Sequence, residues 1–272
     1  MSISGIASAA VPQYLTMVRD ETTSVDNYVK ETPTVQREIA AFQKSARSIN
    51  SAQDLLNDYG SLKVVLGSFG LSSLIDQKAV VKQLLTQDPT SPKSLAKSSG
   101  NASWLKLATA FSSWSPSPLS SSDTVNTMST SYLTSQFETH ADDETPGLGT
   151  ALYFTRSMTS KTSLAGIMSD PKLLKVVETV SGFDPTQFGA LDYDQQVRLL
   201  QPKVDLKDFS TADGIKRYAE RYLATLQIHP DTTAKPATLL SLYGANGENQ
   251  GILSLFTSSS TSSTGSLFSA LT

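Results

Sequence analysis

The sequence contains an internal repeat: residues 41–71 align without a gap with residues 153–183, at an offset of 112 positions. Ten of these 31 positions are identical, and the match persists when the frequent serines are discounted. A repeated sequence folds into repeated structural units, so the repeat constrains the fold more than any other feature. The identical pairs are Phe42/Phe154, Ser45/Ser157, Ser48/Ser160, Ser51/Ser163, Asp58/Asp170, Leu62/Leu174, Lys63/Lys175, Val64/Val176, Val65/Val177 and Gly70/Gly182.

Several identical positions are typical of helix ends. Asp58 and Asp170 precede apolar residues at helical spacing, and a carboxylate in that place accepts hydrogen bonds from the free N–H groups of the first turn. Pro171 follows at the first helical position, where its missing N–H does no harm. Gly70 and Gly182 stand about three turns later, where a glycine in the left-handed conformation ends a helix. Two short buried helices with the same ends are predicted.

The similarity extends beyond the gapless stretch. Asp76-Gln77 and Asp194-Gln195 are each predicted to open a helix, and Ser91-Pro92 is predicted to open a short one that Gly100 closes. Upstream, Tyr14-Leu15-Thr16 and Tyr132-Leu133-Thr134 precede the shared phenylalanines. The β-branched runs are short and fall inside helical patterns, so no strand is predicted. The fold class predicted is therefore all-α, with two tandem copies of a multi-helix unit of roughly 100 residues and flexible termini.

The domain organisation follows from the repeat and from local composition. The segment at 115–123 is rich in serine and proline, which is typical of an exposed linker. The tail has no charged residue after Glu248, and its small apolar clusters are set in Ser, Thr and Gly. The predicted parts are a flexible N-terminus at 1–12, helical repeat 1 at 13–114, the linker at 115–123, helical repeat 2 at 124–230 and the Ser/Thr-rich tail at 231–272.

Composition excludes several classes of function. The chain is 272 residues long with 22 basic and 25 acidic residues, and 70 residues are Ser or Thr. Near-neutral charge argues against nucleic-acid binding, which needs a clustered Lys/Arg field. There is no cysteine, which removes disulfides, thiolate metal sites and a cysteine nucleophile. No run of apolar residues is long enough for a transmembrane helix.

The candidates for chemistry are few. His140 lies beside Asp142, Asp143 and Glu144, which suggests either a site for a hard cation or, with no calcium-loop spacing, a solvated acidic turn; we favour the turn. His229 is predicted to end a helix. The glycine-rich stretch 244–251 lacks the Lys-Ser/Thr of a phosphate-binding loop. Asp192 and Asp194 are explained by helix capping, so we assign no catalytic, cofactor-binding or metal-binding residue.

The order of the motifs resembles a helical domain of unknown function from alphaproteobacteria whose genes often lie in flagellar gene clusters. The resemblance covers roughly residues 13–225. The family pattern has more charge and fewer serines and threonines between the motifs, so this chain would be a divergent member. The matching motifs include Asp54-Leu55-Leu56, Phe69-Gly70-Leu71, Gln136-Phe137-Glu138, Tyr153-Phe154-x-Arg156, Asp170-Pro171-x-Leu173 and Asp194-Gln195-Gln196.

The resemblance implies a non-enzymatic structural or interaction protein associated with the bacterial flagellum, whose partners are other proteins, flagellar components among them. The alternative is a cytoplasmic export chaperone or assembly regulator, and an enzyme of unknown reaction is a third class. The protein is expected to be bacterial, and either cytoplasmic or exported without a cleaved signal peptide, because the N-terminus lacks a basic region and a long apolar run. The candidate partner-binding residues are the apolar side chains of the tail, Leu239, Leu240, Leu242, Tyr243, Ile252, Leu253, Leu255 and Phe256.

Overall fold

A computed structural model of the chain describes residues 10–230, and most of these residues are α-helical, with no strand among them. The chain divides into a compact unit of Met1–His229 and a smaller unit of Pro230–Thr272. The all-α prediction is confirmed for the described residues. The reading of the chain as two tandem copies stays a prediction.

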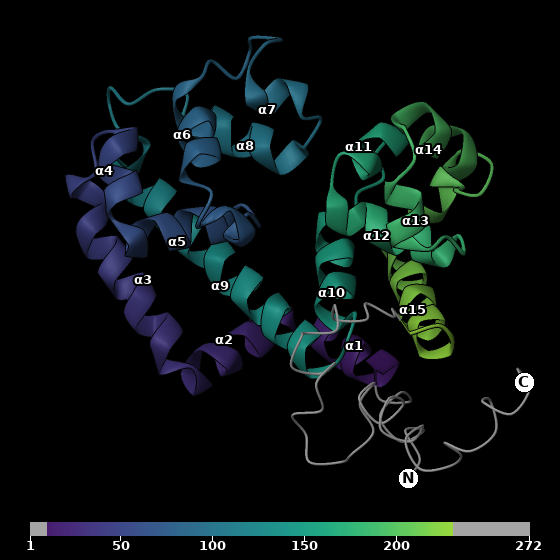
Figure 1. Cartoon of the computed structure of the whole chain (residues 1–272). Helices are drawn as coiled ribbons and strands as arrows, with labels where there is room; N and C mark the ends of the chain where they lie inside the picture. Colours follow the sequence, from purple (N-terminus) through teal and green to yellow (C-terminus); the bar gives the residue numbers. More distant parts are fainter. Residues whose placement is uncertain (1–9, 231–272) are drawn as a thin grey trace, which may run out of the picture. The chain divides into compact units, whose positions relative to one another are not determined.

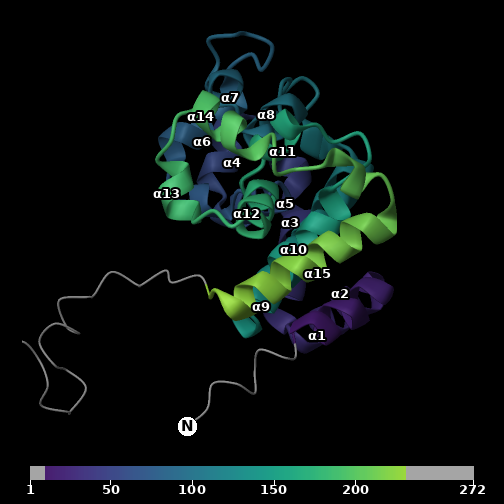
Figure 2. The same ribbon diagram turned by 90° about the vertical axis from the view of Figure 1, so that its right-hand side faces the viewer.

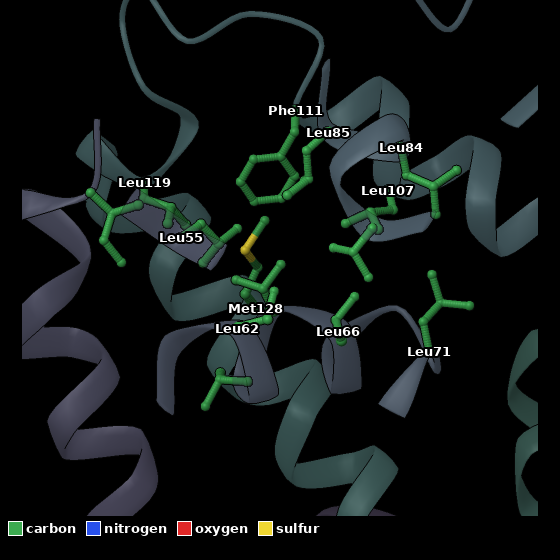
Figure 3. Close-up of a cluster of buried hydrophobic side chains, with 14 of the residues drawn as sticks. Leu55, Leu62, Leu66, Leu71, Leu84, Leu85, Leu107, Phe111, Leu119 and Met128 are labelled. Carbon is green, nitrogen blue, oxygen red and sulfur yellow. The ribbon is translucent and has the colours of Figure 1, made fainter. Parts of the chain in front are cut away.

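The helices between residues 33 and 120 surround a first hydrophobic cluster. In Figure 3, Leu62 and Leu66 of α5 gather with Leu107 of α8 and with Phe111. All four side chains are almost completely buried, so this half has a core of its own. Its elements are α3 (Pro33–Ser45), η3 (Ala46–Ser48), α4 (Ala52–Asn57), α5 (Tyr59–Ser68), η4 (Ser72–Leu74), α6 (Lys78–Thr86), α7 (Leu95–Ser98), α8 (Ala102–Ala110) and η5 (Pro118–Ser120).

The helices after residue 147 surround a second hydrophobic cluster. Its centre is a group of three rings, in which Phe154 stacks on Tyr218 at 5.6 Å and Phe209 meets Tyr218 edge-on at 4.9 Å. Helices α10, α12 and α15 pack against one another around these rings. The elements are α10 (Leu148–Ser157), α11 (Leu164–Met168), α12 (Pro171–Val180), α13 (Pro185–Gly189), α14 (Tyr193–Leu200), η6 (Leu206–Phe209) and α15 (Ala212–Ile228).

Two helical segments join the clusters (Figure 1). Helix α9 (Ser122–Glu144) buries Tyr132 in the first cluster and Phe137 in the second. The N-terminal arm, which we define as α1 (Ala10–Arg19) and α2 (Glu21–Glu31), buries Tyr14 in the second cluster and leads into α3. Each core is therefore completed by the tyrosine-bearing helix that begins the other half of the sequence.

The matched helices α5 and α12 have the same ends. Asp58 accepts a hydrogen bond from the N–H of Ser61, and Asp170 accepts from the N–H of Leu173. Gly70 and Gly182 follow the helices with φ of 72° and 79°, a left-handed backbone that a side chain disfavours. Each glycine and the residue after it close the same pair of hydrogen bonds: Gly70 N to Gly67 O with Leu71 N to Leu66 O, and Gly182 N to Thr179 O with Phe183 N to Glu178 O. Pro171 is the first residue of α12.

The segment predicted as an exposed linker, 115–123, is exposed over most of its length, but two of its residues are buried. Leu119 is completely buried in the first cluster (Figure 3), and the buried Ser117 donates a hydrogen bond to the carbonyl of Ile49. One leucine inside a Ser/Pro-rich stretch is therefore enough to anchor it to a core.

The start of one short helix was also predicted wrongly. Helix α7 begins at Leu95 with Ser94 as its N-cap, three residues later than the predicted Ser91-Pro92 start. Ser91 instead accepts a hydrogen bond from the N–H of Lys93 in the preceding turn. Gly100 follows this helix with φ of 67°.

Candidate interaction site

The N-terminal arm is held on the second half by a surface that α10 and α15 form together. Helix α1 contacts both of these helices, and Figure 2 shows it beside α15. Its apolar side chains recur at helical spacing, so one face of the helix turns towards the second cluster. These side chains are Ala10, Val11, Tyr14, Met17 and Val18.

Tyr14 is the anchor of this contact, because its side chain is completely buried. Its hydroxyl lies 2.6 Å from Oγ1 of Thr155 on α10. Thr155 donates its own hydroxyl hydrogen to the carbonyl of Ala151, so the Tyr14 hydroxyl is the donor in the pair. Burial raises the pKa of Tyr14 to about 12, and the tyrosine stays protonated as this hydrogen bond requires.

Further contacts flank the anchor. Oγ1 of Thr145, at the C-terminus of α9, donates to Oε1 of Gln13 at 2.9 Å. On α2, the half-buried ring of Tyr28 lies 6.0 Å from Phe137 and 5.2 Å from His140, both on α9. The arm therefore combines one deeply buried aromatic side chain with polar and aromatic contacts at the surface.

A cluster of charged side chains lies where the arm meets α9, α10 and α12. Its centre is Glu138, whose side chain is 1% exposed. Arg156 donates from Nε and from Nη2 to Oε1 of Glu138, at 3.2 and 2.5 Å, and Nζ of Lys172 lies 3.7 Å from Oε2. Glu21 of the arm lies 3.7 Å from Nε of Arg156. Two cations and two carboxylates thus neutralise one another and link the arm to three helices of the unit.

Electrostatics at Glu138 combine two opposing effects. Desolvation by burial raises the pKa of Glu138 above its ordinary value, while the charges of Arg156 and Lys172 act in the opposite direction. The two cations therefore favour the charged form of a carboxyl that burial disfavours. Removing one of them would leave a buried charge poorly compensated.

Tyr153 and Asp170 extend the cluster. The hydroxyl of Tyr153 donates to Oδ2 of Asp170 at 2.5 Å, while Oδ1 of Asp170 caps α12. Nζ of Lys172 lies 4.8 Å from the centre of the Tyr153 ring and the guanidinium of Arg156 lies 5.4 Å from it, both within cation–π range. Burial, followed by the hydrogen bond to Asp170, raises the pKa of Tyr153. The predicted cap Asp170 therefore also orients the ring on which both cations rest.

The first half has a smaller polar group at its own tyrosine. The hydroxyl of Tyr132 donates to Oε2 of Glu38 at 2.5 Å, and Nζ of Lys63 lies 2.6 Å from Oε1 of the same carboxylate. The ring of Tyr132 lies so close to α5 that a Cβ on Gly67 would approach it to 2.5 Å. In both halves a helix with the sequence Tyr-Leu-Thr thus inserts its tyrosine into a core and bonds through the hydroxyl to a neighbouring helix.

Glu178 is a second buried acid, on α12. It is 4% exposed, and desolvation raises its pKa to about 7 against the opposing charge of Lys175. The aligned position of the first half holds Leu66, which is completely buried. A titratable group thus occupies a position that is apolar in the aligned segment of the first half.

The structure corrects the expectation for His140. This residue and its acidic neighbours belong to α9, which continues to Glu144, so they do not form a turn. Nε2 of His140 lies 3.4 Å from Glu144 one helical turn later. Among residues 10–230, no three metal-ligating side chains lie together. His229 is the C-cap of α15.

Two surface hollows lie apart from the charged cluster. One, of about 390 Å³, is lined mainly by residues of α3 and α9, with Arg47 of η3 and Leu119 of η5. The other, of about 370 Å³, lies over Phe69 and Met128. Both are on the first half, whereas the arm and the charged cluster are on the second.

The site residues proposed from the sequence have two outcomes. The caps and stops Asp58, Gly70, Asp170, Pro171 and Gly182 lie at the helix ends described above. The candidate partner-binding residues Leu239, Leu240, Leu242, Tyr243, Ile252, Leu253, Leu255 and Phe256 lie outside the described residues.

Sequence reasoning missed the charged cluster, although a signal for it existed. Glu138, Tyr153, Arg156 and Asp170 all belong to motifs that carry the family resemblance, and the fold brings them together. When charged and tyrosine residues of separate motifs lie on different helices, a contact between those helices can explain why the motifs occur together. For Tyr14, the signal was the recurrence of Tyr-Leu-Thr in the two halves.

Comparisons with known proteins agree with the all-α architecture. The family described as "Protein of unknown function (DUF1217)" matches residues 68–215, which is more than half of the chain. The crystal structure of protein AGR_C_984 from Agrobacterium tumefaciens is similar with a TM-score of 0.71 at 20% sequence identity, over 85% of this chain and 98% of that one. The two chains therefore share a fold. No curated protein matches. Within the described residues, no helix has the length and apolar character needed to cross a membrane.

Proposed function

The chain belongs to the DUF1217 family, whose function is unknown, and we propose that it is a non-enzymatic protein that acts through protein–protein contacts and is associated with the bacterial flagellum. The observation that carries the proposal is the packing of α1, a helix from one end of the described chain, on the surface of α10 and α15. Helical proteins commonly recognise one another by laying an amphipathic helix on such a surface.

The chemistry of the charged cluster supports the same role. Glu138 is fixed by Arg156 and Lys172, and Tyr153 by Asp170, so these side chains use their hydrogen-bonding capacity within the protein. Their effect is to hold the arm, α9, α10 and α12 together. Charged groups of this kind give an interface its register and orientation.

The association with the flagellum and the bacterial origin rest on the resemblance of the sequence motifs. The partners proposed are accordingly flagellar components. A second contact region is proposed in the tail, at Leu239, Leu240, Leu242, Tyr243, Ile252, Leu253, Leu255 and Phe256.

The test is a motility assay in the organism that carries the gene, combined with co-purification on a tagged chain. Loss of the gene should reduce motility, and the wild-type chain should restore it and co-purify flagellar proteins. Tyr14→Ala should restore motility poorly, whereas Leu15→Ala, at an exposed position on the same helix, should restore it fully. Circular dichroism of the purified variants checks that both fold. Normal motility without the gene, together with no flagellar protein on the tagged chain, would overturn the proposal.

A further inference from the structure

We propose that α1 is exchanged between copies of this chain, so that the surface formed by α10 and α15 binds α1 of a second copy. This inference rests on the proposed function, because it names the partner of the same interaction surface. The partner helix is the segment Ala10–Arg19, with Tyr14 as its anchor.

The first argument is the way the halves of one chain are joined. The helix that begins the second half, α9, inserts Tyr132 into the core of the first half. The helix at the start of the first half, α1, inserts Tyr14 into the core of the second half. If copies were arranged head to tail, each half would be followed by a helix that inserts its tyrosine into the core of that half. For the first half this helix is α9, and for the second half it would be α1 of the next copy. A single chain has no next copy, and its own α1 takes that place.

The second argument is the nature of the contact. An exchanged α1 would make the same contacts with α10, α15 and the end of α9 as it makes within one chain, including the hydrogen bonds between Tyr14 and Thr155 and between Gln13 and Thr145. Exchange of an identical helix joins two copies through surfaces that already fit each other within one chain. The fraction of copies that exchange depends on protein concentration and on the connection between the helix and the rest of the chain.

The third argument is that connection. A single residue, Asp20, separates α1 from α2; its φ of −144° and ψ of 74° turn the chain, and its side chain accepts from the N–H of Thr23 to begin α2 afresh. No proline or glycine lies between Arg19 and Thr22, so a continuous helix over residues 10–31 is sterically open. The next connection differs, because Pro33 follows Thr32 and disfavours a helical conformation there. The hinge is therefore Asp20, while Tyr28 keeps α2 against α9.

The test uses the purified full-length chain. Asp20→Ala removes the cap and favours the continuous helix, in which α1 points away from its own α10 and α15. The concentration at which copies associate, measured by light scattering after size exclusion, should fall about five-fold relative to the wild type. Adding Tyr14→Ala to this variant should restore the monomer, and adding Leu15→Ala should not.

Fluorescence energy transfer provides a direct readout, because the chain has no cysteine and a single introduced one can be labelled. Copies labelled at Thr16→Cys on α1 are mixed with copies labelled at Ala224→Cys on α15, both exposed positions. Energy transfer that grows on incubation supports exchange, and an excess of a peptide of residues 10–20 should abolish it. The same peptide with Tyr14→Ala should have no effect, which keeps the test valid if a double variant fails to fold.

Two results would overturn the inference. In the first, the Asp20→Ala variant folds but stays monomeric and shows no energy transfer. In the second, copies still associate when Tyr14 is replaced. Either result would leave the proposed function standing if flagellar proteins still co-purify with the chain in cells. Conversely, exchange in the purified protein without any flagellar partner would remove the proposed function alone.

Discussion

The pair formed by Glu138 and Arg156 is predicted to respond very differently to the loss of either partner. The side chain of Glu138 is 1% exposed, whereas that of Arg156 is 42% exposed. Arg156→Met leaves a carboxylate that water cannot reach. Glu138→Gln leaves a guanidinium that water can reach and that retains Glu21 at 3.7 Å.

The magnitudes follow from this asymmetry. Breaking a buried ion pair so that a charge remains unpaired costs about 3 to 5 kcal/mol. Since Lys172 still lies 3.7 Å from Glu138, the expected cost of Arg156→Met is at the lower end, about 3 kcal/mol. Glu138→Gln retains an oxygen that accepts from Arg156 and should cost about 1 kcal/mol. The reference is Lys63→Met, whose ion pair with Glu38 is more exposed and should contribute less than about 1 kcal/mol.

Protonation supplies a second signature of the same effect. Losing Arg156 raises the pKa of Glu138 further, because a charge that lowers it is removed. A carboxyl whose folded-state pKa is raised stabilises the fold at low pH and loses that stability as pH rises through the folded value. The cost of Arg156→Met should therefore grow as pH rises, while that of Glu138→Gln should shrink or stay level.

Urea unfolding at pH 5, 6, 7 and 8, followed by circular dichroism, measures these differences. The reasoning is refuted if Arg156→Met costs no more than Glu138→Gln at pH 7, or if its cost is independent of pH. In that case the burial of Glu138 would not govern the energetics of the cluster.

Three further predictions concern other parts of the chain. Glu178→Leu should stabilise the fold by about 2 kcal/mol at pH 8 and hardly at pH 5, because the pKa of Glu178 is raised to about 7 and the wild type loses stability as this carboxyl ionises; urea unfolding at both pH values measures it. Gly149→Ala should destabilise by about 3 kcal/mol, since its Cβ would clash with the backbone oxygen of Glu138, whereas Gly189→Ala has open space and should be neutral or slightly stabilising in the same assay. Removing residues 237–272 should leave the melting temperature of the unit Met1–His229 unchanged within about 2 °C while abolishing co-purification of partners; a clear drop in melting temperature would indicate instead that the tail packs on the unit.

Helix ends were predictable from the sequence because they depend on neighbouring residues. Asp170 caps α12 through N–H groups two and three residues away, and Gly182 ends it through its own backbone conformation. The same local signals failed at Ser91, because two serine caps three residues apart compete and only the tertiary packing of Leu95 and Ala96 selects Ser94.

The arm and the charged cluster could not be predicted in this way, because they depend on contacts across the whole chain. Tyr14 and Thr155 stand 141 positions apart, so neither segment carries a local pattern that identifies the other as its partner. Arg156 and Glu138 stand 18 residues apart on different helices, and their pairing follows from how α9 and α10 pack. The repeat indicated which helices are equivalent, but it did not indicate which core each one enters.

The composition of the arm's contact bears on whether it can open. A permanent interface is largely apolar, whereas interfaces that form and separate carry polar groups that water can satisfy in the free state. Around the buried ring of Tyr14, α1 presents Gln13 beside the partly buried Val11, Met17 and Val18, and the surface opposite presents Thr145 and Thr155. The polar groups would be hydrated if α1 left, and Glu138 would keep both of its cations, since neither comes from the arm. The second half can therefore release α1 without exposing an unpaired charge, which is the condition that exchange between copies requires.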